Sequence, residues 1–588
     1  MHYGTAYYPD YFPEADWARD LDAMVAAGVT SVRILEFAWC WYQPRPDVFR
    51  FEPLDRFLDL CLARGLRVCL CTPTATPPPW FFQKHPDCRL IDVSGRPSYS
   101  HRHMVCWQHP GALAEALRTI ETLASRYASH PAVWGWQIDN EPNYAEKVAD
   151  CYDFTPHALA AGQAWLREKF HGDLNALNAA WYNQFWSQAY DDWSQIWVTH
   201  RPQTNPGSFV DFLRWREHAL AVFVATQRDL LRRLCPAHRI GVNIPEVGVH
   251  FSTVIGQDYW AQAAGLDWVG TDLYAATADR AADLRALHYS TDLMRSAVAA
   301  ASPNAEFLIA ETQGGPHLRT WEQGFAGHPW DASYLRDSVH AYAERGAKQV
   351  WFFLWRPVPG GMEIGMNATT DIDGGPTEFT QEIARLARED SDALASSAAA
   401  YAARPLALVH YSQDTHRFLA FHNQLPVAGK SQLGCHAWLD TQGFRVAYLN
   451  DADLEKPIPD AALLVLPESH LLSDAAQKNL LAWAEASPSA RRLVLGPHTG
   501  LLDERAQLRG PSRLPLWTAL GIRPGPWRDM GVPVPHRVIL PDAHSSSPAP
   551  TGAFHPEPLR PRPNILLYTH RWTENLSTGS SASSLPDA

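Results

Sequence analysis

The chain has 588 residues, of which 46% are hydrophobic, so it can bury large cores and is too long for one compact domain. Its net charge of −13 argues against a nucleic-acid partner or an anionic membrane surface. No apolar run reaches the roughly 18 residues of a membrane span. The first residues show no signal peptide, and nine sparse cysteines do not suggest a disulfide framework. We therefore expect a cytoplasmic protein with neither a nucleic-acid nor a membrane partner.

Eight apolar runs alternate with helix-like segments in the first two thirds of the chain. The predicted strands are residues 2–8, 31–37, 67–73, 133–140, 239–244, 267–274, 306–311 and 349–355. Gly28, Gly65 and Gly346 stand where helices of this pattern would end, as glycines at helix C-termini do. Strands that alternate with helices in this way predict a (β/α)8 TIM barrel over residues 1–390.

A second, shorter α/β pattern follows a helical linker at residues 391–403. Its predicted strands are residues 406–411, 445–449, 462–466 and 492–495, with the clearest helix at 473–486. We expect a smaller α/β domain over residues 404–524. Residues 525–588 are rich in proline and then in serine, a composition that cannot bury a core, so we expect a flexible tail there.

Aromatic residues are frequent, since 24 Trp, 20 Tyr and 23 Phe together make up 11% of the chain. Flat rings stack on the apolar faces of sugars, so part of this load suits an open sugar-binding cleft. The alternative is packing inside the barrel, which can absorb most of the rings.

Polar or charged side chains recur where the predicted barrel strands end. They are Glu36, Asn140, Glu141, Asn243, Asp272, Glu311 and Arg356. Because the C-terminal ends of barrel strands meet at one mouth, we expect these side chains to converge there.

Two of these carboxylates carry the strongest chemical signal. Glu141 directly follows the carboxamide Asn140 at the end of the fourth run, and Glu311 ends the seventh. Acids in these places suit a retaining glycosidase, in which one carboxyl group protonates the leaving oxygen and the other attacks the anomeric carbon from about 5–5.5 Å away. The environment must then hold the two pKa values apart. The alternative is that both acids are structural, with Glu141 at a helix N-terminus.

Four segments resemble family 42 of the glycoside hydrolases, a family of clan A barrel glycosidases that consists mainly of β-galactosidases. They are Ala6-Tyr-Tyr-Pro-Asp-Tyr-Phe-Pro, Val32-Arg-Ile-Leu-Glu-Phe-Ala-Trp, His130-Pro-Ala-Val-Trp-Gly-Trp-Gln-Ile-Asp-Asn-Glu and Phe352-Phe-Leu-Trp-Arg. The resemblance implies a retaining exo-β-glycosidase with Glu141 as acid/base and Glu311 as nucleophile. It also implies a second domain of class I glutamine amidotransferase-like fold that assembles a homotrimer. The family's C-terminal β-sandwich would be short or missing here.

The resemblance further implies residues that bind the sugar in the first subsite. The matching positions are Arg102, Asn140, Trp321 and Glu363, and we add Tyr274 and Trp355 at the strand ends as substrate-binding candidates. The family's usual histidine three residues after Glu363 is Met366, whose thioether cannot donate a hydrogen bond to a hydroxyl. A β-D-galactoside is therefore the first expectation, with a β-D-fucoside, an α-L-arabinopyranoside or a β-mannoside as alternatives.

Many family members hold a structural zinc ion with four cysteines near the acid/base strand. Here Cys106 and Cys151 match, but Tyr152 and Asp153 stand where further ligands would be expected. Two thiols do not make a tetrahedral zinc site, and histidines near a sugar cleft more often bind hydroxyls. The histidines in question are His101, His103, His109 and His157. We expect neither a metal nor a cofactor.

Two functions of other classes remain open. A barrel that binds sugar without cleaving it is disfavoured, because both carboxylates and Asn140 are present. Glutamine-dependent amide transfer by the second domain is disfavoured, because no cysteine follows its predicted strands and Cys435 lies ahead of one instead.

Overall fold

The computed structural model describes residues 1–92, 94–99, 102–144, 153–196, 205–246, 248–274, 279–316, 330–361, 363–389, 391–496, 498–521 and 564–567. The chain divides into two compact units. The first comprises Met1–Leu177, Gln188–His200 and Asp211–Ala403, and the second comprises Asn178–Ser187, Arg201–Val210 and Arg404–Ala588. Among the helices in the described ranges, none combines the length and the apolar character that crossing a membrane requires.

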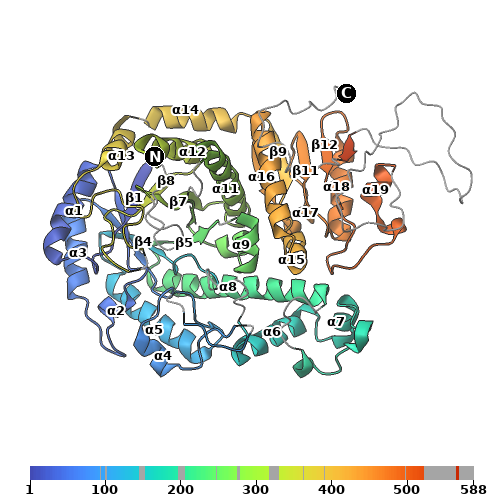
Figure 1. Ribbon diagram of the computed structural model, residues 1–588, viewed down its shortest axis with the longest axis horizontal. Coiled ribbons are helices and arrows are strands. Elements are labelled where there is room, and N and C mark those ends of the chain that lie inside the picture. The colour runs from blue at the N-terminus through green and yellow to red at the C-terminus, as the bar shows by residue number, and fades with distance from the viewer. Residues whose placement is uncertain are drawn as a thin grey trace, which may run out of the picture. The chain divides into compact units, whose positions relative to one another are not determined.

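Eight parallel strands close into a barrel in chain order, with β1 paired to β8 (Figure 1). They are β1 (His2–Ala6), β2 (Ser31–Ile34), β3 (Arg67–Cys71), β4 (Val133–Gln137), β5 (Arg239–Pro245), β6 (Trp268–Asp272), β7 (Glu306–Gln313) and β8 (Gln349–Phe353). The TIM-barrel prediction is confirmed. Most predicted strands run on past the observed end, because burial continues into the residues that follow, as at Tyr7 and Tyr8 after β1.

Helices surround the barrel strands in Figure 1. Those of the first unit and its insertions are α1 (Glu14–Ala26), α2 (Trp39–Tyr42), α3 (Glu52–Ala63), α4 (Pro79–Lys84), α5 (Pro110–Tyr127), α6 (Pro156–Lys169), α7 (Leu174–Ala180), α8 (Pro206–Leu234), α9 (Gly248–Val254), α10 (Tyr259–Ala263), α11 (Arg280–Ala301), α12 (Ala332–Glu344), α13 (Glu378–Glu389) and α14 (Ser391–Ala402). Aspartates begin two of the long ones, since the side chains of Asp279 and Asp331 accept backbone N–H groups at the starts of α11 and α12.

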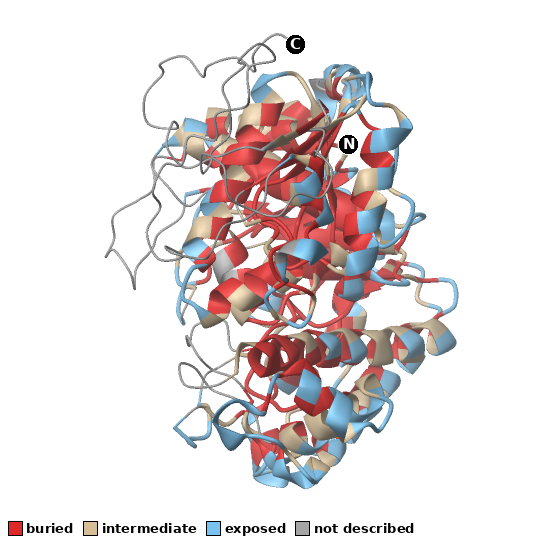
Figure 2. Ribbon diagram, turned by 90° about the vertical axis from the view of Figure 1, so that its right-hand side faces the viewer, coloured by how far each residue is buried: buried red, intermediate tan, exposed pale blue. Residues whose placement is uncertain are grey.

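Tryptophan side chains fill part of the barrel interior. Trp268 and Trp351 pack with Cys69, Leu308 and Ala310 in one buried cluster. Glycines make room for their indoles. A Cβ added to Gly241 would lie 2.1 Å from Trp268, and one added to Gly4 would lie 2.4 Å from Trp351. Buried residues, red in Figure 2, concentrate in the strands, while the exposed ones lie on helices and loops. Packing therefore accounts for part of the aromatic content.

The second unit is built on a five-stranded parallel sheet in the order β10-β9-β11-β12-β13. Its strands are β9 (Leu406–His410), β10 (Arg445–Leu449), β11 (Leu463–Leu466), β12 (Arg492–Leu495) and β13 (Ile565–Leu567). Its helices are α15 (Gln413–Phe421), α16 (Leu425–Thr441), α17 (Asp451–Leu454), α18 (Asp474–Ala486) and α19 (Pro515–Ala519). Leucines from the strands and from α18 form its core.

Strand β13 falls inside the stretch that the composition predicts to be a flexible tail. Its three residues are an apolar run, and they pair in parallel with β12, with Ile565 only 3% exposed. The tail prediction is therefore wrong for residues 564–567. Three apolar residues are enough to add an edge strand to a sheet that already exists, although they could not form a core by themselves.

Candidate active site

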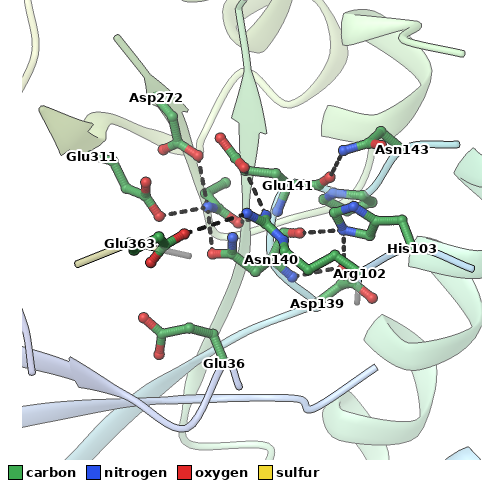
Figure 3. Close-up of polar contacts among 12 residues, drawn as sticks. Glu36, Arg102, His103, Asp139, Asn140, Glu141, Asn143, Asp272, Glu311 and Glu363 are labelled. Carbon is green, nitrogen blue, oxygen red and sulfur yellow. Dashed lines mark hydrogen bonds and ion pairs between the residues drawn. The ribbon is translucent and has the colours of Figure 1, made fainter. Parts of the chain in front are cut away.

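Polar side chains from several strand ends meet at the mouth of the barrel. Figure 3 shows the carboxylates of Glu141, Asp272 and Glu311 around one space, with Arg102 and Glu363 beside it. Arg356 differs from the expectation: its guanidinium lies 2.9 Å from Asp16 Oδ2 and 3.3 Å from Asp20 Oδ2, both on α1. Arg356 lies three residues beyond the end of β8, and its side chain reaches the neighbouring helix instead of the mouth.

The backbone after β4 turns sharply to present Glu141. Asp139 and Glu141 adopt left-handed conformations with φ of 56° and 51°, which cost energy in residues other than glycine and are frequent at functional sites. Hydrogen bonds hold this turn. The Asp139 N–H donates to Thr72 Oγ1 at 2.6 Å, and the Glu141 N–H donates to Asn243 Oδ1 at 3.0 Å. The backbone that carries Glu141 is therefore anchored to β5 and to the residue that follows β3.

Three carboxyl groups lie close together in the centre of the mouth. One oxygen each of Glu141, Asp272 and Glu311 lies within 4.8 Å of the other two. All three side chains are buried, with residue exposures of 8%, 2% and 5%. For Glu141 and Glu311 this approach suits the separation of about 5–5.5 Å that a retaining glycosidase needs.

Glu311, on β7, is surrounded by hydrogen-bond donors. Arg33 Nη2 lies 2.6 Å from Oε1, and the Tyr274 hydroxyl donates to Oε2 at 2.5 Å. The Asn243 amide lies 3.4 Å from Oε1. Burial first, and then the charge of Glu311, raises the pKa of Tyr274 well above its usual value, so its hydroxyl remains a donor. Three donors therefore converge on the Glu311 carboxylate.

Arg33, on β2, is a functional candidate that the sequence reasoning missed. Its guanidinium is buried between Glu311 and Glu36, 3.2 Å from the latter. Burial alone would lower the pKa of Arg33, but the two carboxylates outweigh it and hold that pKa well above its usual value. The available signal was an Arg and a Glu three residues apart in an otherwise apolar run. A charge inside a strand buried on both faces needs a buried partner.

Glu141 has a different partner at the outer side of the mouth. Arg102 Nη2 lies 2.9 Å from Glu141 Oε2, and Arg102 Nη1 lies 3.9 Å from Glu363 Oε1. The Arg102 and Glu363 side chains keep 23% and 30% of their surfaces exposed. Arg102 and Glu363, which the sequence proposed for sugar binding, are thus placed beside Glu141, where a ligand can reach them.

Asn243, on β5, joins most of these groups. Its Nδ2 donates to Asp272 Oδ2 at 2.7 Å and to Asn140 Oδ1 at 3.0 Å. Gln137 Nε2 also donates to Asn140 Oδ1, at 3.2 Å. With its oxygen occupied in this way, Asn140 has its amide nitrogen left to donate, as recognition of a sugar hydroxyl requires.

The remaining predicted binding residues are less directly placed. Trp355 has no exposed surface, so its contact with a sugar stays a prediction. Trp321 lies outside the described residues. Met366 is 9% exposed, and its N–H donates to the Glu363 carbonyl at 3.2 Å, so one turn carries both residues.

The residues around Cys106 do not fit the zinc site of the family resemblance. Thr155 Oγ1 donates to the buried Cys106 sulfur at 3.1 Å. Burial, and then the neighbouring Asp153, raises the pKa of Cys106 well above its usual value, whereas zinc binds a thiolate. Within the described part of the chain, Cys106 belongs to no group of three metal-ligating side chains. Cys151 lies outside that part.

Asp87, His109 and His157 do bring one potential ligand atom each to within 4.8 Å of the others. However, His109 Nδ1 accepts the N–H of Ala112 at 3.1 Å, where it caps the start of α5. Its proton therefore lies on Nε2, which donates to Asp87 Oδ1 at 3.0 Å. A protonated ring nitrogen cannot ligate a metal, so this geometry fits a helix cap better than a metal site.

Comparison with known proteins gives a consistent picture. A family model described as "Beta-galactosidase", for glycoside hydrolase family 42, matches residues 6–392. The chain is 29% identical to beta-galactosidase Bga of Halorubrum lacusprofundi, over 92% of this chain and 74% of that protein. It is 31% identical to beta-galactosidase BgaA of Thermus sp., over 87% of this chain and 77% of that protein.

Solved structures agree with these matches. The crystal structure of a beta-galactosidase from the psychrophilic Marinomonas ef1 superposes with a TM-score of 0.75 at 27% identity, covering 87% of this chain and 78% of that one. The structure of the Halorubrum lacusprofundi enzyme gives a TM-score of 0.77 at 26% identity, covering 89% and 76%.

Proposed function

The chain belongs to the family 42 glycoside hydrolases, and from that membership we propose that it is a retaining β-galactosidase acting on non-reducing terminal β-D-galactosides. The observation that carries the mechanism is the approach of a Glu141 and a Glu311 oxygen to within 4.8 Å. An inverting enzyme instead holds its carboxyl groups about 6.5–9.5 Å apart to admit a water molecule between base and sugar. The spacing therefore supports double displacement.

In the first step, Glu311 attacks the anomeric carbon and forms a glycosyl ester, while the bond to the aglycone oxygen breaks. Glu141 gives its proton to that oxygen, so the aglycone leaves as an alcohol. The hydrogen bonds from Arg33 and Tyr274 aim and orient the Glu311 carboxylate before the attack. Each donor then stays beside its own oxygen of the ester that forms.

In the second step, a water molecule takes the place of the aglycone. Glu141, now a carboxylate, removes a proton from the water as it attacks the anomeric carbon, and the bond to Glu311 breaks. Two inversions at one carbon return the starting configuration, so the product is the β-anomer. Glu141 ends the cycle protonated and Glu311 ends it ionised.

Arg102, Asn140 and Glu363 are proposed to hold the sugar in the first subsite. The support is that the guanidinium and the second carboxylate lie at the exposed side of Glu141, while Asn140 has its amide nitrogen available to donate. A sugar hydroxyl that binds Arg102 would replace part of its contact with Glu141. Tyr274 is proposed to contribute to the sugar site by its hydrogen bond to Glu311.

We also propose a homotrimer and a cytoplasmic location. The proposal of a trimer rests on the family resemblance of the second unit and on its α/β fold. Amide transfer by that unit lacks its nucleophile in the described residues, since Cys435 is buried within α16 and does not follow a strand. We therefore propose that this unit serves assembly and not amide transfer.

A panel of nitrophenyl glycosides tests the activity, with β-galactoside, β-fucoside, α-L-arabinopyranoside, β-glucoside and β-mannoside compared at equal enzyme concentration. We expect the highest kcat/KM among these on a sugar of galactose configuration. Proton NMR of the first product formed should show the β-anomer. Release of the α-anomer first, or no turnover of any glycoside, would contradict the proposed function.

A further inference from the structure

Asp272 is a third carboxyl group in the site, and the double displacement above leaves it without a role. It ends β6 and is 2% exposed. Asn243 Nδ2 donates to its Oδ2 at 2.7 Å. Its Oδ1 is buried and has no hydrogen-bond partner among the described residues. A buried carboxyl oxygen of this kind is costly as part of an anion, and far less so as an O–H group.

The charges around the three carboxyl groups single out Asp272. Glu311 is paired with Arg33, and Glu141 is paired with Arg102. In the described part of the chain, Asp272 makes no ion pair, and its hydrogen-bond partner is the uncharged amide of Asn243. Each glutamate thus has a cation beside it, which Glu311 shares with Glu36 and Glu141 shares with Glu363. Among the described residues, Asp272 has no cation of its own and faces the Asn243 amide and the Glu141 carboxyl group.

The titratable groups that face Asp272 come from three other strands. They are Glu311 on β7, Glu141 after β4 and Arg33 on β2, and Tyr274 follows on its own segment. Burial first, and then the charges of Glu311 and Glu141, raises the pKa of Asp272 well above its usual value, against the opposing effect of Arg33. With both glutamates ionised, Asp272 is the acid that keeps a proton.

We propose that Asp272 holds a proton in the resting enzyme and passes it to Glu141 when a glycoside enters and releases Glu141 from Arg102. The inference rests on the proposed function, because it assigns Glu141 as the acid. In the transfer, the O–H bond at Asp272 breaks and an O–H bond at Glu141 forms, directly or through one water molecule within the 4.8 Å that bounds their separation. Asp272 acts through Glu141 and does not touch the glycosidic bond.

This arrangement keeps the charge of the site constant through the reaction. At rest, Glu141 and Glu311 are ionised and Asp272 is neutral. With substrate bound, Asp272 and Glu311 are ionised and Glu141 is neutral. In the glycosyl-enzyme, Glu311 is an ester while Glu141 and Asp272 are ionised. The three acids carry two negative charges at every stage, and Arg33 and Arg102 stay beside them throughout. After hydrolysis the proton returns from Glu141 to Asp272.

The pH profile of Asp272→Asn tests the proposal, because the amide has the size of the acid but cannot hold or release a proton. In the wild type, a proton stays on the Asp272–Glu141 pair until high pH. In the variant, Glu141 titrates alone beside Arg102. The basic limb is the part of the pH profile in which kcat/KM falls as the pH rises. For an alkyl galactoside, which needs an acid, we expect this limb to lie roughly one pH unit lower in the variant than in the wild type. At pH values above the limb, kcat/KM of the variant should be about tenfold lower than that of the wild type. For a dinitrophenyl galactoside, which needs little protonation, the limb should move much less.

Two further variants make the result specific. Asp272→Glu restores a titratable group and should return the limb toward its wild-type position, even if the rate falls. Asp283→Asn replaces another buried aspartate, hydrogen-bonded to Tyr334 on α12, and should leave the limb in place. If Asp272→Asn does not fold, as judged by thermal melting, Asp272→Ser serves instead, since it is smaller and leaves room for water.

A basic limb of Asp272→Asn that coincides with the wild type on the alkyl galactoside would overturn the proposal. So would an equal shift on both substrates, because Asp272 would then act on Glu311. Failure of the proposed function looks different. If the wild type prefers another glycone, the same profiles are measured with that glycone, and if Glu141→Ala shows no dependence on the leaving group, it is the acid assignment that fails.

Discussion

Glu141 and Glu311 come from similar places in the barrel but have different neighbours. Glu311 is held by the buried Arg33 and the half-buried Tyr274, whereas Glu141 faces Arg102, whose side chain is 23% exposed. A carboxylate fixed by two such donors is suited to be a nucleophile that must stay ionised. A carboxyl group at the outer side of the mouth is where a leaving alcohol can be protonated and released. Single-residue changes at this site therefore have distinct expected signatures.

Replacing Glu141 with alanine should separate substrates by their leaving groups. A positioned general acid contributes about 10²–10⁴-fold, so kcat/KM on an alkyl galactoside should fall by about that factor. A dinitrophenyl galactoside should lose far less, since its phenolate leaves without help. Steady-state kinetics on both substrates measure the difference. An equal loss on the two would mean that Glu141 is not the acid.

Met366 tests which sugar the site recognises. It shares a turn with Glu363, so a histidine there could reach a sugar hydroxyl that the thioether cannot serve. One hydrogen bond in a transition state is worth about 1–3 kcal/mol, so Met366→His should raise kcat/KM on the galactoside by roughly 10–100-fold. The fucoside and the arabinopyranoside, run in parallel, show whether the gain is specific. A wild type already selective for galactoside, with no gain from histidine, would refute this role for Met366.

At the scale of helices and strands, sequence patterns predicted the architecture better than the contacts within it. Every predicted barrel strand overlaps an observed one, because a strand buried on both faces leaves a continuous apolar run. That Glu141 and Glu311 come together at the mouth could be predicted because each stands at the end of such a predicted run, while their catalytic roles stay predictions. Arg33 could not be assigned, since its partner Glu311 is 278 residues away. The same holds for Asn243, whose four contacts depend on register between strands.

The packing of tryptophan over glycine in the barrel gives a prediction about stability. A Cβ at position 241 would lie 2.1 Å from the Trp268 ring, which buried neighbours hold in place. Gly241→Ala should therefore lower the free energy of unfolding by about 1–3 kcal/mol. Gly360→Ala, at a position with no atom within 4 Å of the added Cβ, is the matched control and should change it little. Denaturant unfolding compares the two variants. Equal free energies of unfolding would show that the Trp268 ring can move aside at little cost in stability.

For the whole molecule, the two compact units have separate proposed tasks. The barrel holds the described polar site, and the second unit has a parallel sheet with a leucine-rich core of its own. For this second unit we propose a role in assembly, as the family resemblance implies. The sequence pattern predicted an α/β unit here. It did not predict the edge strand β13, because these three apolar residues stand in a stretch dominated by proline and serine.

Assembly is directly measurable. We expect a homotrimer at micromolar concentration, with about three times the 65.8 kDa mass of one chain. Sedimentation velocity measures it, with the concentration varied to separate a stable trimer from weak association. A species that stays at the monomer mass over the whole range would remove this role from the second unit.

The identity of the nucleophile is the central claim, and trapping the glycosyl-enzyme tests it most directly. An activated 2-deoxy-2-fluoro-β-galactoside should inactivate the enzyme, because the fluorine slows both formation and hydrolysis of the ester, while the activated leaving group speeds its formation alone. Digestion and mass spectrometry should then place one fluorosugar on the peptide that contains Glu311, and Glu311→Gln should neither be labelled nor turn over substrate. A label on another carboxylate, or near-normal activity of Glu311→Gln, would contradict the account.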